Sequence, residues 1–286
     1  MLVLPCGAGK TVIGIAALAR LGQEALILTT NAASVSQWKE ELLDKTTLEE
    51  SLIGIYGADR KQVRPVTIAT YQILTHRASK EAEFRHMKLF RERRWGLIIY
   101  DEVHLLPAPV FRATAEIQAA RRLGLTATLI REDGREGDVF SLVGPKRYEA
   151  PWKRLEREGW IASVECTELR VPLAGETLES YRRATAREQH RIAGENPLKL
   201  KAAREILERH PGEQTLVIGQ YLDQLKTLAA SLGVPLVTGE TPAREREEWY
   251  QKFRRGEIRI LVVSKVANFA LDLPDAAVAV QWSGSF

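Results

Sequence analysis

The chain has 286 residues, of which 45% are hydrophobic and 27% charged, and its net charge of +4 corresponds to a pI near 9.0. This composition is that of a soluble globular protein with one large or two ordinary domains, and the mild basic excess permits nucleic-acid binding without establishing it. Two cysteines, Cys6 and Cys166, exclude a disulfide framework, and no run of about 20 uncharged apolar residues predicts a membrane span.

The first half of the chain alternates between short apolar runs and amphipathic segments. Apolar spacing predicts a helix over Lys10–Leu21, which Gly22 can end, and the capping-box pattern of Ser34 and Gln37 predicts the start of a second helix. This alternation indicates a parallel sheet with helices on both faces. Buried strands are expected at Met1–Leu4, Ala25–Leu28, Val66–Ala69, Leu97–Tyr100 and Leu123–Leu125.

The pattern changes after Ala127, where the segment IREDGREGD is polar and predicts a loop. Residues 175–196 carry many charges and few apolar side chains. Beyond them the alternation resumes, and Thr241 is placed to cap a new helix. We therefore predict two α/β domains, 1–150 and 151–286, joined near residues 145–161. The further expected elements are helices at Trp152–Gly159 and Leu222–Leu232 and strands at Thr215–Ile218, Pro235–Val237, Ile258–Val263 and Ala277–Gln281.

The stretch LPCGAGKT places a glycine-rich loop between an apolar strand and a helix. Backbone N–H groups of such a loop can cradle phosphates, and the helix N-terminus adds positive potential. Lys10 then reaches the β- and γ-phosphates, and the Thr11 hydroxyl ligates Mg²⁺. Leu4 stands where the general pattern has glycine, and the alternative is a turn without a ligand, although GxGKT at a helix start is rare by chance. The predicted phosphate-binding residues are Pro5, Cys6, Gly7, Ala8, Gly9, Lys10 and Thr11.

A second motif, LIIYDEVH, ends a buried strand in two acids, Asp101 and Glu102. Ligands of open parallel sheets collect at the carboxyl ends of the strands, so both acids are expected to face the glycine loop. There Asp101 can hold Mg²⁺ through water, and Glu102 can polarise the attacking water, while His104 leads toward the rest of the protein. Alone, an acidic pair after a strand is usually a solvated edge. Together with LPCGAGKT it predicts a P-loop NTPase that uses ATP and Mg²⁺.

A third motif, LTATL, ends another strand, and its Thr126 and Thr128 can couple hydrolysis to a second surface. Taken alone, the stretch is better explained as a run of strand-forming residues. With GAGKT and DEVH, however, TAT gives the chain a resemblance to superfamily 2 helicases, specifically the XPB family of DNA helicases and translocases. Family-specific motifs occur in the family's order over nearly the whole chain: LPCGAGKT, SVSQWKEEL, TIATYQIL, the RED triplet and LVVSKVANFALDLPDA.

The resemblance implies two RecA-like domains that close on ATP and walk along one DNA strand with 3′→5′ polarity. It assigns Asp272 to the nucleotide ribose, and Gln220 and Tyr221 to the start of motif IV. DNA contacts are expected at strand-end loops rather than in a basic patch; without the resemblance, Thr30 and Asn31 would be an ordinary turn. The implied DNA contacts are Thr30, Asn31, Thr70 and Tyr71 in the first domain and Thr238, Gly239, Ser264 and Lys265 in the second.

Two charged segments leave alternatives open. The triplet Arg131, Glu132 and Asp133 matches residues proposed in this family to help open the duplex, but a solvated loop is an equally good explanation. Residues 175–196 occupy the position of the family's thumb insertion, where Arg182 and Arg183 suit phosphate contacts that position DNA without reading its sequence. A solvated helix hairpin explains this segment almost as well. The histidines show no metal-ligand spacing with either cysteine, so we predict no zinc or iron site.

The resemblance also predicts a chain truncated at both ends, since family members carry adenine-contacting residues before the phosphate loop and an arginine motif after motif V. We therefore expect this chain to bind nucleotide weakly and to hydrolyse it poorly. The alternatives to a helicase are a translocase that remodels duplex DNA without separating strands and an inactive DNA-binding fragment. Expected partners are DNA, as single strand and duplex junction, and a nuclease or other repair protein. We expect a monomer in a prokaryotic cytoplasm, acting in DNA repair.

Overall fold

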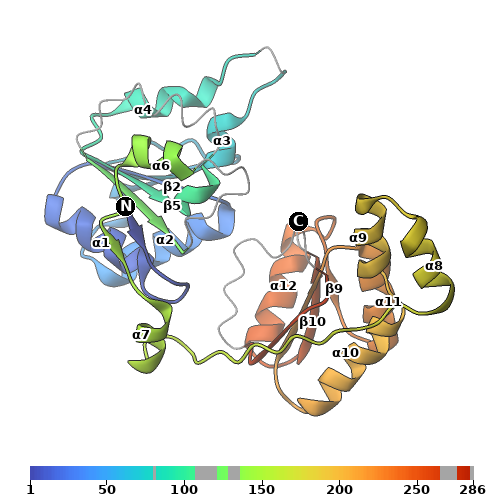
Figure 1. The fold of residues 1–286 in the computed structure, drawn as a ribbon. Helices are drawn as coiled ribbons and strands as arrows, with labels where there is room; N and C mark the ends of the chain where they lie inside the picture. Colours follow the sequence, from blue (N-terminus) through green and yellow to red (C-terminus); the bar gives the residue numbers. More distant parts are fainter. Residues whose placement is uncertain (80–81, 107–120, 128–135, 265–275, 284–286) are drawn as a thin grey trace. The chain divides into compact units, whose positions relative to one another are not determined.

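The computed structural model describes residues 1–79, 82–106, 121–127, 136–264 and 276–283. The chain divides into two compact units, Met1–Glu165 and Cys166–Phe286, each with its own parallel sheet (Figure 1). The division falls later than residue 150, where the sequence places the boundary, because the chain still contacts the first unit beyond that point: Ile161 lies beside the glycine loop at Gly7. Within the described ranges, no helix has the length and apolar character needed to cross a membrane.

The first unit holds a seven-stranded sheet in the order β3-β4-β2-β5-β6-β1-β7, with all pairings parallel. Successive residues of a strand point to opposite faces, so the apolar central strands bury side chains on both sides. In β2, Leu26 and Leu28 enter one core, and Ala25 and Ile27 enter the other. The strands are β1 (Leu2–Val3), β2 (Ala25–Thr29), β3 (Ile53–Tyr56), β4 (Val66–Thr70), β5 (Leu97–Asp101), β6 (Arg122–Thr126) and β7 (Tyr148–Glu149).

Helices cover both faces of this sheet (Figure 1). α1 (Lys10–Leu21) and α2 (Ala32–Lys45) pack on one face, and α3 (Tyr71–Thr75), α4 (Leu89–Glu92) and α6 (Glu136–Val143) pack on the other. α1 and α2 meet closely: a Cβ built on Gly14 would lie 2.5 Å from the Trp38 ring. The remaining elements among the described residues of this unit are the 3₁₀ turns η1 (Glu50–Leu52), η2 (Arg85–Lys88) and η3 (Val103–Leu105) and the short helix α7 (Trp152–Arg157).

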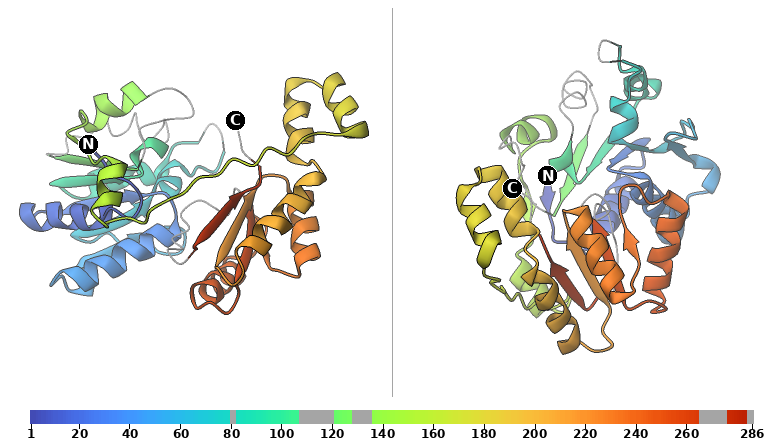
Figure 2. Two further views of the ribbon diagram at one scale, coloured as in Figure 1. Left: turned by 60° about the horizontal axis from the view of Figure 1, so that its bottom comes forward. Right: turned by 90° about the vertical axis from the view of Figure 1, so that its right-hand side faces the viewer.

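The second unit holds a four-stranded parallel sheet in the order β11-β8-β10-β9. α10 and α11 pack on one face and α12 on the other, an arrangement that can be followed in Figure 2. α8 and α9 pack against each other as a hairpin (Figure 1). The elements in the described part of this unit are α8 (Gly175–Arg183), α9 (Ala186–Gly194), α10 (Leu198–Arg209), β8 (Thr215–Gly219), α11 (Leu222–Leu232), β9 (Leu236–Val237), α12 (Ala243–Arg254), β10 (Ile260–Ser264) and β11 (Val278–Gln281).

Two predicted helix starts are wrong. Asn31 caps α2, accepting a hydrogen bond from the Ser34 N–H at 2.9 Å, so Ser34 lies inside the helix. Asparagine is at least as good a cap as serine and comes first in the chain. Pro242 flanks α12 in place of the predicted cap Thr241, whose hydroxyl accepts from the Thr238 N–H at 2.9 Å and closes the preceding turn. β3 and α10 are elements that the sequence patterns do not predict.

Candidate active site

The glycine loop runs over residues 5–9, from the end of β1 into α1. Gly7 and Gly9 both have φ of 76°, the left-handed region in which a side chain is strained, so this path needs glycine at both positions. Gly9 precedes the first helical residue, Lys10, and no side chain caps the helix. The N–H groups of the first turn are therefore left for an anion. Cys6 and Gly7 are exposed on the loop, where a ligand can reach them.

The order of the strands brings the three predicted motifs to one edge of the sheet. β6 lies between β5 and β1, and because all three are parallel their carboxyl ends lie at the same edge. The Leu4 N–H donates to the Thr126 carbonyl at 2.9 Å, and Asp101 is the register partner of Leu125. The glycine loop, Asp101 and Thr126 thus share a small region of the first unit.

The Lys10 ammonium ties the loop to this edge. It donates to the Leu4 carbonyl at 3.4 Å and lies 3.6 Å from Oε1 of Glu102. The Lys10 side chain is 11% exposed and that of Glu102 is 28% exposed, so the pair is partly shielded from bulk water and weakly screened by salt. The charges of the Lys10 ammonium and the Glu102 carboxylate therefore offset each other beside the glycine loop.

Asp101 is held from three sides. Its Oδ2 accepts a hydrogen bond from the Trp38 indole N–H at 2.8 Å, and its Oδ1 accepts from the Glu102 backbone N–H at 3.1 Å. Its carbonyl oxygen accepts from the Tyr71 hydroxyl at 2.8 Å. Burial raises the pKa of the Asp101 carboxyl and the Glu102 charge adds to this, whereas the Trp38 hydrogen bond and the Lys10 charge lower the pKa. The hydrogen bonds fix the orientation of a carboxylate that solvent alone would leave free to rotate.

Glu102 has a strained backbone, with φ of 47° and ψ of 52°, and is the one non-glycine residue of the described segments with positive φ. That conformation costs about 1–2 kcal/mol, and such strain concentrates at functional sites. The two carboxylate oxygens face different partners, Oε1 toward Lys10 and Oε2 toward Nδ1 of His104 at 3.5 Å. The same His104 nitrogen lies 2.8 Å from Oγ1 of Thr126. Polar contacts therefore run from Lys10 through Glu102 and His104 to Thr126.

The site offers oxygen donors of the kind that Mg²⁺ takes. The Thr11 hydroxyl lies in the first turn of α1 and the Asp101 carboxylate at the end of β5. The described part of the chain holds no group of three or more His, Cys, Asp or Glu side chains that could bind a metal by themselves. Mg²⁺ bound together with a nucleotide typically uses one or two protein oxygens, the phosphates and water, so the residues present fit it.

The predicted DNA-contact residues of the first unit follow the ends of two neighbouring strands, β2 and β4. Asn31 caps α2, and Thr70 caps α3 by accepting from the Ile73 N–H at 3.2 Å. Tyr71 is 3% exposed, and burial raises the pKa of its hydroxyl well above the usual range, so the hydroxyl stays a donor to Asp101. The structure thus places the Tyr71 side chain inside the unit, away from the surface at which a direct DNA contact would lie.

In the second unit, the predicted contacts Thr238 and Ser264 are buried at the ends of β9 and β10, whereas Gly239 is exposed. Arg182 and Arg183 are exposed on α8, where both form ion pairs with Glu179. The other predicted site residues lie outside the described residues: Thr128, Arg131, Glu132, Asp133, Lys265 and Asp272.

Trp38 is the site contact that the sequence reasoning misses. Its helical spacing assigns it to the core, which is right for the ring, since the residue is 1% exposed, but says nothing of the indole N–H. A buried indole N–H needs an acceptor. The strand of the DEVH motif ends in a carboxylate, which is a suitable acceptor for that N–H. A buried tryptophan together with a strand-end carboxylate was the sequence signal that could have predicted the contact.

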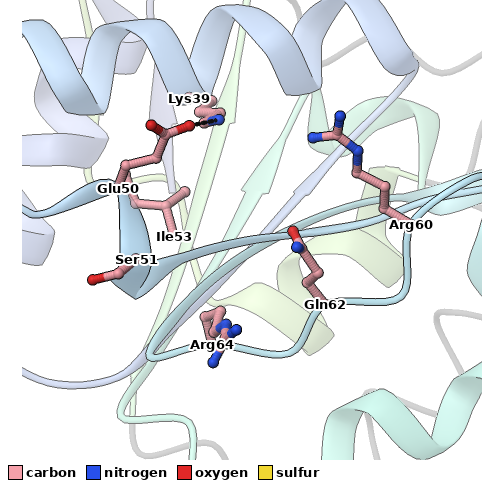
Figure 3. Close-up of a pocket in the computed structure, with 7 residues that line it drawn as sticks. All are labelled: Lys39, Glu50, Ser51, Ile53, Arg60, Gln62 and Arg64. Atoms are coloured by element: carbon pink, nitrogen blue, oxygen red, sulfur yellow. Dashed lines mark hydrogen bonds and ion pairs between the residues drawn. The ribbon is translucent and has the colours of Figure 1, made fainter.

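A second polar hollow lies beside the edge strand β3 and away from this site (Figure 3). Arg60 and Gln62 extend into it from the loop that follows β3, and Lys39 of α2 forms an ion pair with Glu50 across it. None of its lining residues belongs to the predicted site, so the hollow is separate from the phosphate loop. The residues that line it are Lys39, Glu50, Ser51, Ile53, Arg60, Gln62 and Arg64.

Comparison with known proteins identifies the family. The profile of the ERCC3/RAD25/XPB C-terminal helicase matches residues 155–286, and that of the type III restriction enzyme res subunit matches residues 1–131. The DNA 3′-5′ helicase XPB of Mycobacterium tuberculosis is 58% identical over 100% of this chain. The chain belongs to the XPB family. The helicase/translocase subunit XPB/SSL2 of the general transcription and DNA repair factor IIH of Saccharomyces cerevisiae is 35% identical over the whole chain. The chain spans 52% of the first of these relatives and 35% of the second.

A solved structure supports the predicted fold of this XPB-family chain. Saccharomyces cerevisiae Dbp5 bound to RNA and ADP BeF3 matches with a TM-score of 0.65 and 13% identity, covering 99% of this chain and 70% of that one. At this identity the likeness shows the fold alone. The predicted family and the α/β fold with two RecA-like domains are therefore confirmed.

Proposed function

We propose that this chain is the ATP-driven motor core of an XPB-type DNA helicase or translocase, moving 3′→5′ in the service of DNA repair. The observation that carries the proposal is the meeting of Lys10, Glu102 and Asp101 at one sheet edge beside the glycine loop. The substrate class is taken from the XPB relatives, whose names specify DNA, 3′-5′ polarity and a DNA repair factor.

The contacts of Lys10 suggest how nucleotide binding prepares the site. Phosphates in the glycine loop offer the ammonium a stronger negative partner than Glu102, so Lys10 turns toward the β- and γ-phosphates. Thr11 and Asp101 would hold Mg²⁺, which neutralises charge that develops on the phosphates. When Lys10 turns to the phosphates, its ion pair with Glu102 breaks and the Glu102 carboxylate becomes available as a base. Nucleotide binding and activation of the base are then coupled.

Glu102, once free, is placed to act as the general base. It accepts a proton from the attacking water as the new oxygen–phosphorus bond forms and the bond to the bridging oxygen of ADP breaks. His104, which contacts both Glu102 and Thr126, lies where this change of charge is passed to the TAT segment. DNA is engaged by the strand-end loops at Thr30, Asn31 and Thr70 and by the second unit.

Two substitutions with opposite signatures test the assignment. Lys10→Ala is expected to lose binding of a fluorescent ATP analogue, because the ammonium that would contact the β- and γ-phosphates is then absent. Glu102→Gln is expected to keep that binding and to lose about 10²–10⁴-fold in DNA-stimulated phosphate release. Turnover should be measured in the wild type and in both variants. Normal turnover of Glu102→Gln would refute the role of Glu102.

Two displacement assays separate the competing functions. A helicase displaces a strand from a duplex with a single-stranded tail, whereas a translocase without strand separation displaces only the third strand of a triplex. DNA binding without any nucleotide turnover would instead indicate a DNA-binding module and overturn the motor assignment.

A further inference from the structure

The hydrogen bond between Trp38 and Asp101 joins a core helix to the predicted metal ligand. The indole N–H donates to Oδ2 at 2.8 Å, within the usual range for a donor to a carboxylate, and hydrogen bonds to a charged acceptor are stronger than neutral ones. Trp38 belongs to the second turn of α2, and Asp101 is the last residue of β5. The two residues are 63 positions apart in sequence, so the contact is a product of the tertiary fold.

The Trp38 ring cannot move away from this position easily. It is 1% exposed, and Gly14 of α1 leaves no space on the side where the ring meets that helix. Leu125 of β6 is buried in the same cluster. The packed ring keeps its N–H in one orientation, because turning the N–H would require the whole ring to shift within a close-packed core.

The fixed donor determines which way the Asp101 carboxylate faces. Trp38 takes one lone pair of Oδ2, and the Glu102 N–H takes one lone pair of Oδ1. Tyr71 fixes the backbone of the same residue through its carbonyl oxygen. Each carboxylate oxygen keeps a further lone pair for a cation or for its water, and the rotation about the side chain that would misdirect these lone pairs breaks both bonds.

We propose that Trp38 is a positioning residue for the nucleotide-bound cation, acting through Asp101. Its indole N–H holds the Asp101 carboxylate in the orientation that receives Mg²⁺ or its water. The inference rests on the proposed function, since it assigns a role within the same nucleotide site. Outer partners that orient a metal ligand in this way typically contribute about 10–100-fold to metal affinity, and we expect the lower end here because Asp101 would act through water.

The test measures what Mg²⁺ adds to nucleotide affinity, without any turnover. The dissociation constant of a fluorescent ATP analogue is determined for each protein in Mg²⁺ and in EDTA, and the ratio of the two values is the Mg²⁺ gain. Trp38→Phe keeps an aromatic ring and removes the N–H, and it is expected to lower the gain about tenfold. Affinity in EDTA should stay near that of the wild type, a split that a general loosening of the fold would not produce.

Trp95→Phe is the matched control. Trp95 is also buried in the first unit, at 4% exposed, and its indole N–H donates to the Leu89 carbonyl at 3.0 Å. It lies in the core on the opposite face of the sheet from Trp38. Its substitution should lower thermal stability by a similar amount and leave the Mg²⁺ gain unchanged.

A double substitution shows whether Trp38 acts through Asp101. Asp101→Asn is expected to lower the gain by itself, and adding Trp38→Phe should then cause no further loss, because residues that act as one unit are not additive. An unchanged gain in Trp38→Phe, or an equal further loss in the Asp101→Asn background, overturns the inference alone. A wild type with no Mg²⁺ gain overturns the proposed nucleotide site together with it.

A measurement on the unaltered protein covers the case in which Trp38→Phe does not fold. The indole N–H resonance of Trp38 should shift when Mg²⁺ is added to the nucleotide complex, while that of Trp95 should stay in place. A Trp38 resonance that does not respond to Mg²⁺ overturns the inference.

Discussion

The contact between Gly14 and Trp38 gives a stability prediction in which two effects oppose each other. Gly14→Ala places a methyl group inside α1, where alanine is favoured over glycine by about 1 kcal/mol. That methyl group would lie 2.5 Å from Cη2 of Trp38 and 3.2 Å from its Cζ3, and 3.4 Å from a Leu125 methyl. Overpacking of this kind costs about 1–3 kcal/mol. The steric term wins, and we expect a net loss of about 1 kcal/mol.

Thermal unfolding followed by circular dichroism measures this loss as a decrease in Tm of about 2–4 °C per kcal/mol for a unit of this size. Trp38→Phe provides the matched background, since it removes the outer ring atoms that the methyl group meets. There the clash is absent, and Gly14→Ala should raise stability by about 1 kcal/mol. A Gly14→Ala protein that is more stable than the wild type would refute the close packing of α1 on the Trp38 ring.

Two further predictions concern a helix cap and an ion pair. Asn31→Ala removes the N-cap of α2 and should lower the free energy of unfolding in urea by about 0.5–2 kcal/mol. This loss should exceed that of Ser34→Ala, and equal losses would contradict the assignment of Asn31 as the cap. Glu24→Gln removes the partner of Arg93 and should cost less than about 1 kcal/mol at pH 7. The Arg93 hydrogen bond lowers the pKa of Glu24 in the folded state, so its stabilisation is present above the unfolded value of about 4.3 and is lost as the pH falls through the folded value. The free energies of unfolding of Glu24→Gln and the wild type should therefore converge as the pH falls through the lowered folded pKa of Glu24. A difference that stays constant over the whole acid titration would contradict the ion-pair explanation.

The features that could be predicted from the sequence are those with local causes. The glycine loop needs positive φ at Gly7 and Gly9, and α1 begins and ends at the predicted residues because Gly9 and Gly22 flank it. The alternation of apolar and amphipathic segments predicts the parallel sheets, and strand-end acids in a parallel sheet are brought to the edge where the loop lies. These inferences need only neighbouring residues and the geometry of a sheet.

The features that could not be predicted depend on which elements pack together. The Trp38 contact requires that α2 lie over the strand ending in Asp101, and the burial of Tyr71 requires that its ring turn inward from the start of α3. Spacing along the chain places both residues in the right elements and leaves their partners undetermined. The Asn31 cap, by contrast, was predictable from local chemistry, because asparagine three residues before Ser34 is as strong a cap as serine.

The backbone of Glu102 has a consequence for any attempt to make this protein more heat-resistant. A glycine at this position would adopt the same φ without strain and would lack the carboxylate that the proposed reaction needs. Selection for folding yield or melting temperature alone would therefore favour replacement of the proposed base, and a screen of that kind would enrich proteins that fold better and do not turn over. At residue 102, the side chain that suits the backbone best is therefore not the one that carries the proposed base.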